Sequence, residues 1–263
     1  MLVSDEEKFE VATDDMRLAV CSVPWDSEIF GFPVAAIQTI DVHDAERARD
    51  AFARYKKWIR DQSIELVSCR LPHDRVSTSM FLERHGFRFV EMVLHPTLRG
   101  IQSLPDIETT LRVEPVLKCE VPIIAAMAER AFGCERYHMD PRVDSQLADL
   151  RYGRWIRNSF GDERQILLKI VRADDIAGFF VIENRPDGTV YWHLTAINPD
   201  FKGRKVGTEV WRAMMAYHRE AGMGCILTTI SARNTPVLNL YSKLNFRFAP
   251  PEITLHWFRR DHG

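Results

Sequence analysis

The feature that most constrains this chain is an apolar strand that runs through a Pro-Asp turn into a basic loop and then a helix. The stretch reads Leu194-Thr-Ala-Ile-Asn-Pro-Asp-Phe-Lys-Gly-Arg-Lys-Val-Gly207. Backbone N–H groups at the start of a helix lack intrahelical acceptors, and the helix dipole favours negative charge beside them. The stretch therefore predicts an anion site that suits a pyrophosphate. A plain connection between strand and helix is the alternative.

A second motif follows this loop. Helical spacing of apolar residues predicts a helix over about 207–222, and a strand is expected at 225–230. The chain then reads Asn234-Thr-Pro-Val-Leu-Asn-Leu-Tyr-Ser-Lys-Leu-Asn-Phe246. In order and spacing, the two motifs resemble the two signatures of the GNAT superfamily of N-acetyltransferases. The resemblance implies that acetyl-CoA is the co-substrate and that its acetyl group passes to a primary amine by direct attack.

The chain departs from the family pattern at two glycines. Lys202 and Gly207 match the first and last positions of the acyl-CoA loop, but Lys205 replaces its first glycine. Asn245 replaces the glycine that usually precedes Phe246. A lysine in the loop either obstructs the close approach of phosphate or pairs with it. A non-catalytic acyl-CoA-binding protein therefore stays an alternative to an enzyme.

The chain also repeats itself. One constant shift lays residues 66–71 on 225–230 and 82–89 on 241–248. In the first copy Asp44 and Glu46 stand at the loop, where carboxylates would repel pyrophosphate. The predicted fold class is α/β, with two tandem GNAT-like domains, each a mixed, mostly antiparallel sheet flanked by helices. We expect residues 1–106 to form the degenerate domain and residues 107–263 the catalytic N-acetyltransferase domain.

Tyr241 is the expected general acid. Acyl transfer from a thioester requires a proton for the departing thiolate. A phenol with a pKa of about 10 is protonated at neutral pH and can donate to sulfur without a metal or a covalent intermediate. Packing of the ring in the core is the alternative reading of Tyr241.

His193 is the candidate general base. Alternation along the strand expected at 189–197 predicts one face that carries four side chains: Tyr191, His193, Thr195 and Ile197. On that face the imidazole could take the proton of the amine directly or through water. A structural histidine is the alternative.

The other cofactor contacts follow from the resemblance. Backbone N–H groups around Ala196 and Ile197 would hold the pantetheine arm and polarise the thioester carbonyl. Asn234 is expected to cap the helix after it, and the matching asparagine of the family also contacts CoA. The positions expected at the phosphates are Lys202, Gly203, Arg204, Lys205, Val206, Gly207 and Thr208.

Three further segments narrow the resemblance. Residues 24–34, 136–141 and 152–156 are similar to the dTDP-fucosamine acetyltransferase group, which also pairs a degenerate half with an active one. A nucleotide-linked amino sugar is the acceptor that this similarity implies, and another small amine, an aminoglycoside or a peptide amine is the alternative. The candidate acceptor contacts are Arg136, Tyr137, His138 and Asp140. Their spacing supports no metal site.

Composition excludes several partners. The 35 basic and 37 acidic residues are spread along the chain, which argues against nucleic acid. Five cysteines without a C-x-x-C pair disfavour a disulfide framework and indicate a reducing cytoplasm. No apolar run approaches the roughly 18 residues of a membrane span. The expected partner is a small-molecule amine, and the sequence leaves the oligomeric state, including a homodimer, open.

Overall fold

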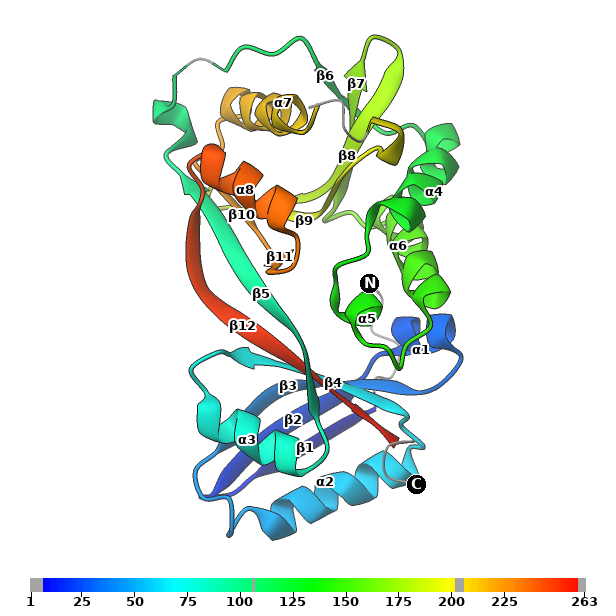
Figure 1. The fold of residues 1–263 in the computed structure, drawn as a ribbon, viewed down its shortest axis with the longest axis vertical. Helices are drawn as coiled ribbons and strands as arrows, with labels where there is room; N and C mark the ends of the chain where they lie inside the picture. The colour runs from blue at the N-terminus through cyan, green and yellow to red at the C-terminus, as the bar shows by residue number, and fades with distance from the viewer. Residues whose placement is uncertain (1–6, 106, 202–205, 260–263) are drawn as a thin grey trace. The chain divides into compact units, whose positions relative to one another are not determined.

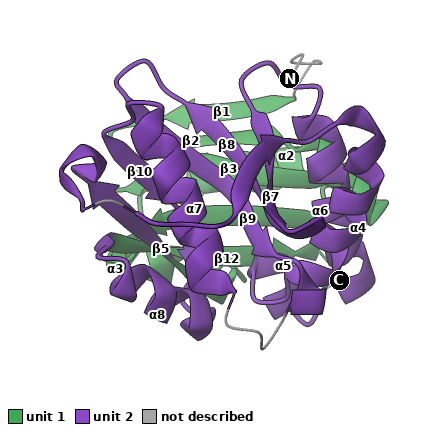
Figure 2. Cartoon of the chain, turned by 90° about the horizontal axis from the view of Figure 1, so that it is seen from above, with its two compact units in different colours: residues 1–93, 250–263 green, residues 94–249 purple. Residues whose placement is uncertain are grey.

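The computed structural model describes residues 7–105, 107–201 and 206–259. The chain divides into two compact units, residues 1–93 with 250–263 and residues 94–249 (Figure 2). It leaves the first unit within strand β5 (Arg88–Arg99) and returns within strand β12 (Arg247–Phe258). This division differs from the expected boundary after residue 106. Both crossings occur inside continuous strands, so no loop or change of composition marks them.

The described part of the first unit is a mixed sheet flanked by helices (Figure 1). Its strands lie in the order β1-β2-β3-β4-β12, and only the β3–β4 pair is parallel. They are β1 (Lys8–Ala12), β2 (Met16–Ser22), β3 (Val34–Val42) and β4 (Leu66–Pro72), with the end of β12. The helices are α1 (Pro24–Phe30), α2 (Arg49–Asp61) and α3 (Val76–Arg84). Phe52 and Tyr55 of α2 pack into the core of this unit.

The second unit repeats this plan with more elements. Its strands lie in the order β5-β10-β9-β8-β7-β6, and only the β9–β10 pair is parallel. They are β6 (Arg112–Pro115), β7 (Ile166–Arg172), β8 (Asp175–Asn184), β9 (Thr189–Ile197) and β10 (Cys225–Thr228), with the short β11 (Ile230–Ser231). Each unit is thus a mixed, mostly antiparallel sheet flanked by helices, which confirms the predicted fold class.

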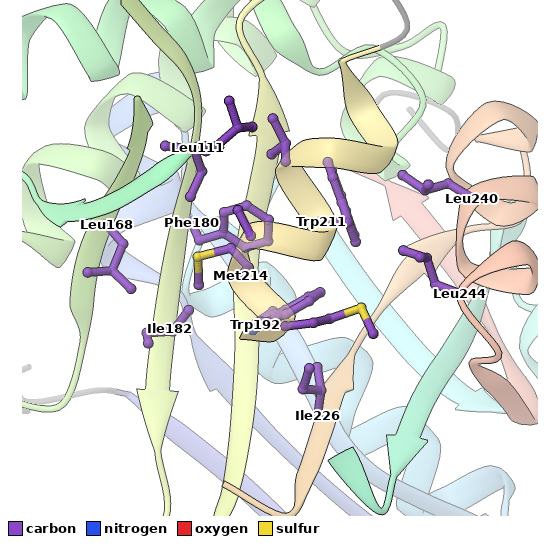
Figure 3. Close-up of a cluster of buried hydrophobic side chains, with 14 of the residues drawn as sticks. Leu111, Leu168, Phe180, Ile182, Trp192, Trp211, Met214, Ile226, Leu240 and Leu244 are labelled. Atoms are coloured by element: carbon purple, nitrogen blue, oxygen red, sulfur yellow. The ribbon is translucent and has the colours of Figure 1, made fainter. Parts of the chain in front are cut away.

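The helices of the second unit pack against its sheet and form two apolar cores with it. They are α4 (Val121–Ala131), α5 (Arg136–Met139), α6 (Ser145–Ser159), α7 (Gly207–Glu220) and α8 (Thr235–Lys243), with 3-10 turns η1 (Ile101–Ser103), η2 (Lys118–Glu120) and η3 (Pro199–Phe201). One core gathers α7 and α8 around Trp192 and Trp211 (Figure 3). The other packs α4 and α6 against β8 and β9. Within the described ranges, no helix is both long and apolar enough to span a membrane.

The buried His218 of α7 makes stability depend on pH. Its Nε2 accepts the indole N–H of Trp192 at 2.9 Å, and burial lowers its pKa to about 4. The unfolded chain binds the proton more tightly, so stability present above pH 6.5 is lost as pH falls toward 4, by about 3 kcal/mol in full. Denaturant unfolding at pH 7 and pH 4.5 should show a smaller acid-induced loss in His218→Gln than in the wild type. Equal losses in the two proteins would contradict this assignment.

Candidate acyl-transfer site

Strand β9 parts from β10 at its midpoint. The parallel pairing runs from Thr189 opposite Cys225 to Trp192 opposite Thr228, where β10 ends. On the other edge β9 stays paired with β8 as far as Ile197. The β10-facing edge of residues 193–197 therefore has no strand partner in β10. Backbone N–H and C=O groups on such an edge are available to an extended ligand.

A β-bulge marks the point of parting. Val181 of β8 lies opposite Leu194, but the next residue, Ile182, lies opposite Trp192, so His193 is the extra residue. A bulge bends the strand, increases its twist and re-aims the side chains that follow. The opening between β9 and β10 and the change of side-chain direction therefore begin at the same residue.

The bulge corrects one prediction from the sequence. Trp192 packs in the core around α7, whereas Leu194 and Ala196 pack in the core around α4 and α6. Strict alternation would have kept these three side chains on one face. Ile197 packs against the α7 core. The expectation that four alternate residues share a face was therefore wrong: Tyr191 and His193 lie on one side of the sheet, and Thr195 and Ile197 on the other.

His193 is paired with a carboxylate that sequence reasoning missed. Its Nε2 lies 2.9 Å from Oε2 of Glu183, on the neighbouring strand β8, and its ring meets that of Tyr191 edge to face at 4.7 Å. Glu183 lies directly opposite Tyr191 in the register of the two strands. A carboxylate that accepts Nε2–H fixes the tautomer and leaves Nδ1 as the basic nitrogen. Glu183 can be found as the partner of His193 only from the register between β8 and β9, and the sequence alone does not give this register.

The structure of Tyr241 is compatible with both interpretations from the sequence, a ring packed in the core and a hydroxyl that can donate a proton. Its ring is buried on α8 and packs against Phe246 at 4.8 Å and Trp211 at 6.2 Å. Burial raises the pKa of the phenol, while polar interactions with Trp211, Thr195 and Thr228 oppose the rise. Thr228 ends β10, and Thr195 follows the bulge of β9. The hydroxyl is therefore protonated at neutral pH and lies near the place where the two strands part.

The N-terminus of α7 lets a ligand approach the backbone closely. The helix begins at Gly207, and the side chain of its N-cap residue, Val206, satisfies none of the N–H groups of the first turn. A Cβ at Gly207 would lie 2.9 Å from Cδ1 of Ile197, so the glycine lets the helix begin against the end of β9. Val206 is buried, so only its backbone could meet a ligand, whereas Thr208 is half-buried. Of the other expected phosphate contacts, Lys202, Gly203, Arg204 and Lys205 lie outside the described residues.

The turn between β9 and α7 is held by hydrogen bonds. Nδ2 of Asn198 donates to the carbonyl of Ile176 at 2.9 Å, and its Oδ1 accepts the backbone N–H of Asp200 at 3.0 Å. The carboxylate of Asp200 in turn binds the guanidinium of Arg130 at 2.6 Å. These contacts tie the turn to β8 and α4. Ala196 is buried through its side chain, which leaves its backbone as the group able to face a ligand.

Asn234 caps α8, as the sequence predicts. Its Oδ1 accepts the backbone N–H of Val237 at 3.4 Å. The cap uses the carbonyl oxygen and leaves the amide nitrogen for other partners. The predicted contact of Asn234 with CoA stays a prediction.

The candidate acceptor residues lie on α5 and at its end, where most of them make internal contacts. Nε2 of His138 lies 2.8 Å from the carboxylate of Asp149, and Asp140 is buried against Arg142 at 2.8 Å. The guanidinium of Arg136 lies 4.6 Å from the ring centroid of Tyr137. In the described part of the chain, no group of three or more His, Cys, Asp or Glu side chains is placed to hold a metal ion.

The first unit differs at the position that matches the start of α7. Before α2, the carboxylate of Asp44 accepts the backbone N–H groups of Glu46 at 2.9 Å and Arg47 at 3.1 Å. These two hydrogen bonds lower the pKa of the Asp44 carboxyl, and the bond from Arg47 has the larger effect. The turn that leads into α2 thus carries its own anion at the backbone N–H groups of Glu46 and Arg47, although the N-cap residues of both α2 and α7 make no side-chain cap.

Comparisons with known proteins agree with this geometry. Residues 126–246 match the family described as Acetyltransferase (GNAT) family. Mycothiol acetyltransferase of Saccharopolyspora erythraea is 27% identical over 125 residues, which are 48% of this chain and 39% of that protein. The chain therefore spans less than half the length of this relative.

Solved structures extend the likeness to nearly the whole chain. A tandem GNAT protein from the clavulanic acid biosynthesis pathway, solved without AcCoA, has a TM-score of 0.63 at 14% identity, over 96% of this chain and 82% of that one. A GCN5-related N-acetyltransferase from Sphaerobacter thermophilus has a TM-score of 0.63 at 13% identity, over 93% and 80%. At such identities the likeness shows the fold alone. The family match covers part of the second unit, and the likeness to the tandem GNAT protein confirms the predicted fold of two GNAT-like halves.

Proposed function

We propose that the second unit transfers the acetyl group of acetyl-CoA to a primary amine. The observation that carries the proposal is the opening between strands β9 and β10, which begins at His193. This opening lies between the N-terminus of α7, whose N-cap residue makes no side-chain cap, and the buried phenol of Tyr241. In this proposal the edge of β9 at Ala196 and Ile197 holds the pantetheine arm. The phosphates bind the first turn of α7 at Gly207 and the basic loop before it.

The chemistry requires two proton transfers. The amine nitrogen attacks the thioester carbon and the C–S bond breaks, so one proton leaves nitrogen and one is needed at sulfur. Nδ1 of His193 accepts the first proton, directly or through water, because Nε2 is held by Glu183. The hydroxyl of Tyr241 donates the second. Backbone N–H groups at the open edge of β9 stabilise the negative charge that develops on the carbonyl oxygen.

The acceptor that we propose is a nucleotide-linked amino sugar, on the similarity of residues 24–34, 136–141 and 152–156 to the dTDP-fucosamine acetyltransferase group. Another small amine or a peptide amine is the alternative, and the name of the mycothiol-acetylating relative is consistent with a small molecule. The catalytic domain proposed at 107–263 contains every site residue named above. The five cysteines, all of them described, form no disulfide, and a reducing cytoplasm is the location that we propose.

Acetyl transfer can be tested with a panel of amines. The full chain is incubated with acetyl-CoA and with amino sugar nucleotides, aminoglycosides, polyamines and peptide amines, while free thiol and product mass are followed. Thiol release that depends on one amine class, with an acetylated product, supports the proposal. Tight binding of acetyl-CoA without product from any amine would favour the non-catalytic alternative.

The pairing of His193 with Glu183 predicts a graded loss of activity. His193→Gln removes the base and should lower turnover about 10²–10⁴-fold, the usual value of general base catalysis. Glu183→Gln keeps a hydrogen-bond acceptor but removes the charge that supports the imidazolium, so a smaller loss is expected. Single-turnover acetyl transfer with saturating acetyl-CoA measures both losses. A folded His193→Gln protein with the wild-type rate would exclude His193 as the base.

Only the second unit is expected to bind CoA. Asp44 already occupies the amides before α2, and a carboxylate there repels pyrophosphate. Titration calorimetry of the full chain with acetyl-CoA should therefore give one site per chain. Two sites of similar affinity would overturn the assignment of the first unit as degenerate.

A further inference from the structure

A cavity of about 480 Å³ lies within the first unit, outside the proposed transfer site. Its volume falls in the range of about 300–1,000 Å³ that is usual for small-molecule sites. The walls come from α2, from the residues after α3 and from the end of β12. Most of the wall is apolar and aromatic, contributed by Phe52, Tyr55, Ile59, Phe87 and Trp257.

The matching place in the second unit is filled. The repeat lays Leu66 on Cys225, and in the strand registers Trp257 then takes the place of Leu98 and Arg259 that of Gly100. After Gly100 the second unit continues into η1, whose Ile101 is fully buried in the core around α7.

Gln102 closes that position in the second unit, because its Nε2 donates to the carbonyls of Arg219 and Met223 at the end of α7. By the same register Gln102 matches residue 261, which lies outside the described residues, and Arg259, at the position of Gly100, lines the cavity.

The charged part of the described lining is basic. Lys56, Arg60, Arg259 and His85 line the cavity beside the buried hydroxyl of Tyr55, and none of the described lining residues carries a carboxylate. Guanidinium nitrogens of Arg259 donate to the carbonyls of Ile64 and Ile59 at 3.0 and 2.8 Å, and Nε also lies 3.0 Å from the carboxylate of Glu65, so this cation has a fixed position.

Lys56 and Arg60 stand four residues apart on α2, a spacing at which like charges repel. Among the described residues neither forms an ion pair with a carboxylate. On the same helix Lys57 is paired with Asp61 at 2.5 Å. Burial and the charge of Arg60 lower the pKa of Lys56, as expected of a cation that lacks a counter-charge. A bound anion would relieve the repulsion between these two groups.

We propose that this cavity binds a small amphipathic carboxylate, with its apolar body against the aromatic wall and its head group between Lys56, Arg60 and Arg259. Aromatic and aliphatic side chains recognise the body by burial of apolar area, and the cations recognise the head group by charge-assisted hydrogen bonds. The site is independent of the acetyl-transfer function, since every lining residue belongs to the first unit.

Calorimetry with 4-phenylbutyrate, and with 4-phenylbutanol as the uncharged analogue, tests the proposal on the full chain. We expect one carboxylate per chain and at least tenfold weaker binding of the alcohol. The double variant Lys56→Gln/Arg60→Gln should weaken carboxylate binding tenfold or more. Lys57→Gln is the matched control, because it removes a charge from the same helix outside the cavity, and it should leave binding unchanged. Both positions of the double variant are exposed, so the fold should be retained.

Saturating acetyl-CoA should not displace 4-phenylbutyrate, which distinguishes the cavity from the transfer site. Failure of the carboxylate to bind would overturn the proposal, and so would equal affinity of the carboxylate and the alcohol. Equal weakening by Lys57→Gln and by the double variant would show that general surface charge, rather than the cavity, attracts the anion.

Discussion

Tyr241→Phe is expected to lower turnover about 10²–10⁴-fold while acetyl-CoA binds with nearly unchanged affinity. The substitution removes only the hydroxyl that lies near Thr195 and Thr228, and it keeps the ring that packs against Trp211 and Phe246. The loss corresponds to about 3–5 kcal/mol in the barrier for thiolate departure. It should appear in kcat rather than in binding, because a proton donor acts mainly in the transition state. Pre-steady-state acetyl transfer measures this step directly.

Two controls separate proton donation from packing. Tyr217→Phe removes a hydroxyl from a half-buried tyrosine on α7 and should leave turnover unchanged. An acyl donor with a more acidic thiol needs the proton less, so the loss caused by Tyr241→Phe should shrink with such a donor. A folded Tyr241→Phe protein that retains wild-type rates when chemistry is limiting would assign the tyrosine to the core alone.

The helices and strands that carry the motifs were predictable because their signals are local. The helix expected at 207–222 is α7, and the strand expected at 189–197 is β9. Asn234 caps α8 because the side chain, the following proline and the helix all lie within a few residues. The internal repeat of the sequence matches the structure, since each half has one parallel strand pair within a mostly antiparallel sheet.

The pairing of strands that lie far apart in the chain could not be predicted from the sequence. The bulge at His193 depends on the register between β8 and β9, and a shift of one residue moves side chains to the opposite face. Glu183 became a candidate only once that register placed it beside His193. The return of β12 to the first unit likewise depends on its pairing with β4. The cavity beside α2 is lined by residues 52–60, 85–87 and 257–259, which lie far apart in the sequence, so no local pattern predicts it.

Gly207→Glu should weaken acetyl-CoA binding by about 100-fold or more. A carboxylate at the first turn of α7 would stand where the proposed pyrophosphate binds, and like charges about 4 Å apart repel by roughly 4 kcal/mol near a protein surface. The new Cβ would also press on Ile197, at 2.9 Å from its Cδ1. Since that contact is with the end of a side chain, a modest rearrangement should accommodate it, and stability should fall much less than affinity.

Gly207→Gln separates the two effects, because glutamine matches glutamate in size and lacks the charge. We expect Gly207→Gln to weaken acetyl-CoA binding less than Gly207→Glu, and the gap between the two should narrow as salt rises, since salt screens the repulsion. Calorimetry at low and high ionic strength measures both affinities, and thermal unfolding checks that each variant is folded. If folded Gly207→Glu binds acetyl-CoA as the wild type does, the phosphates do not lie at the start of α7. The anion site would then have to be sought elsewhere along the open edge of β9.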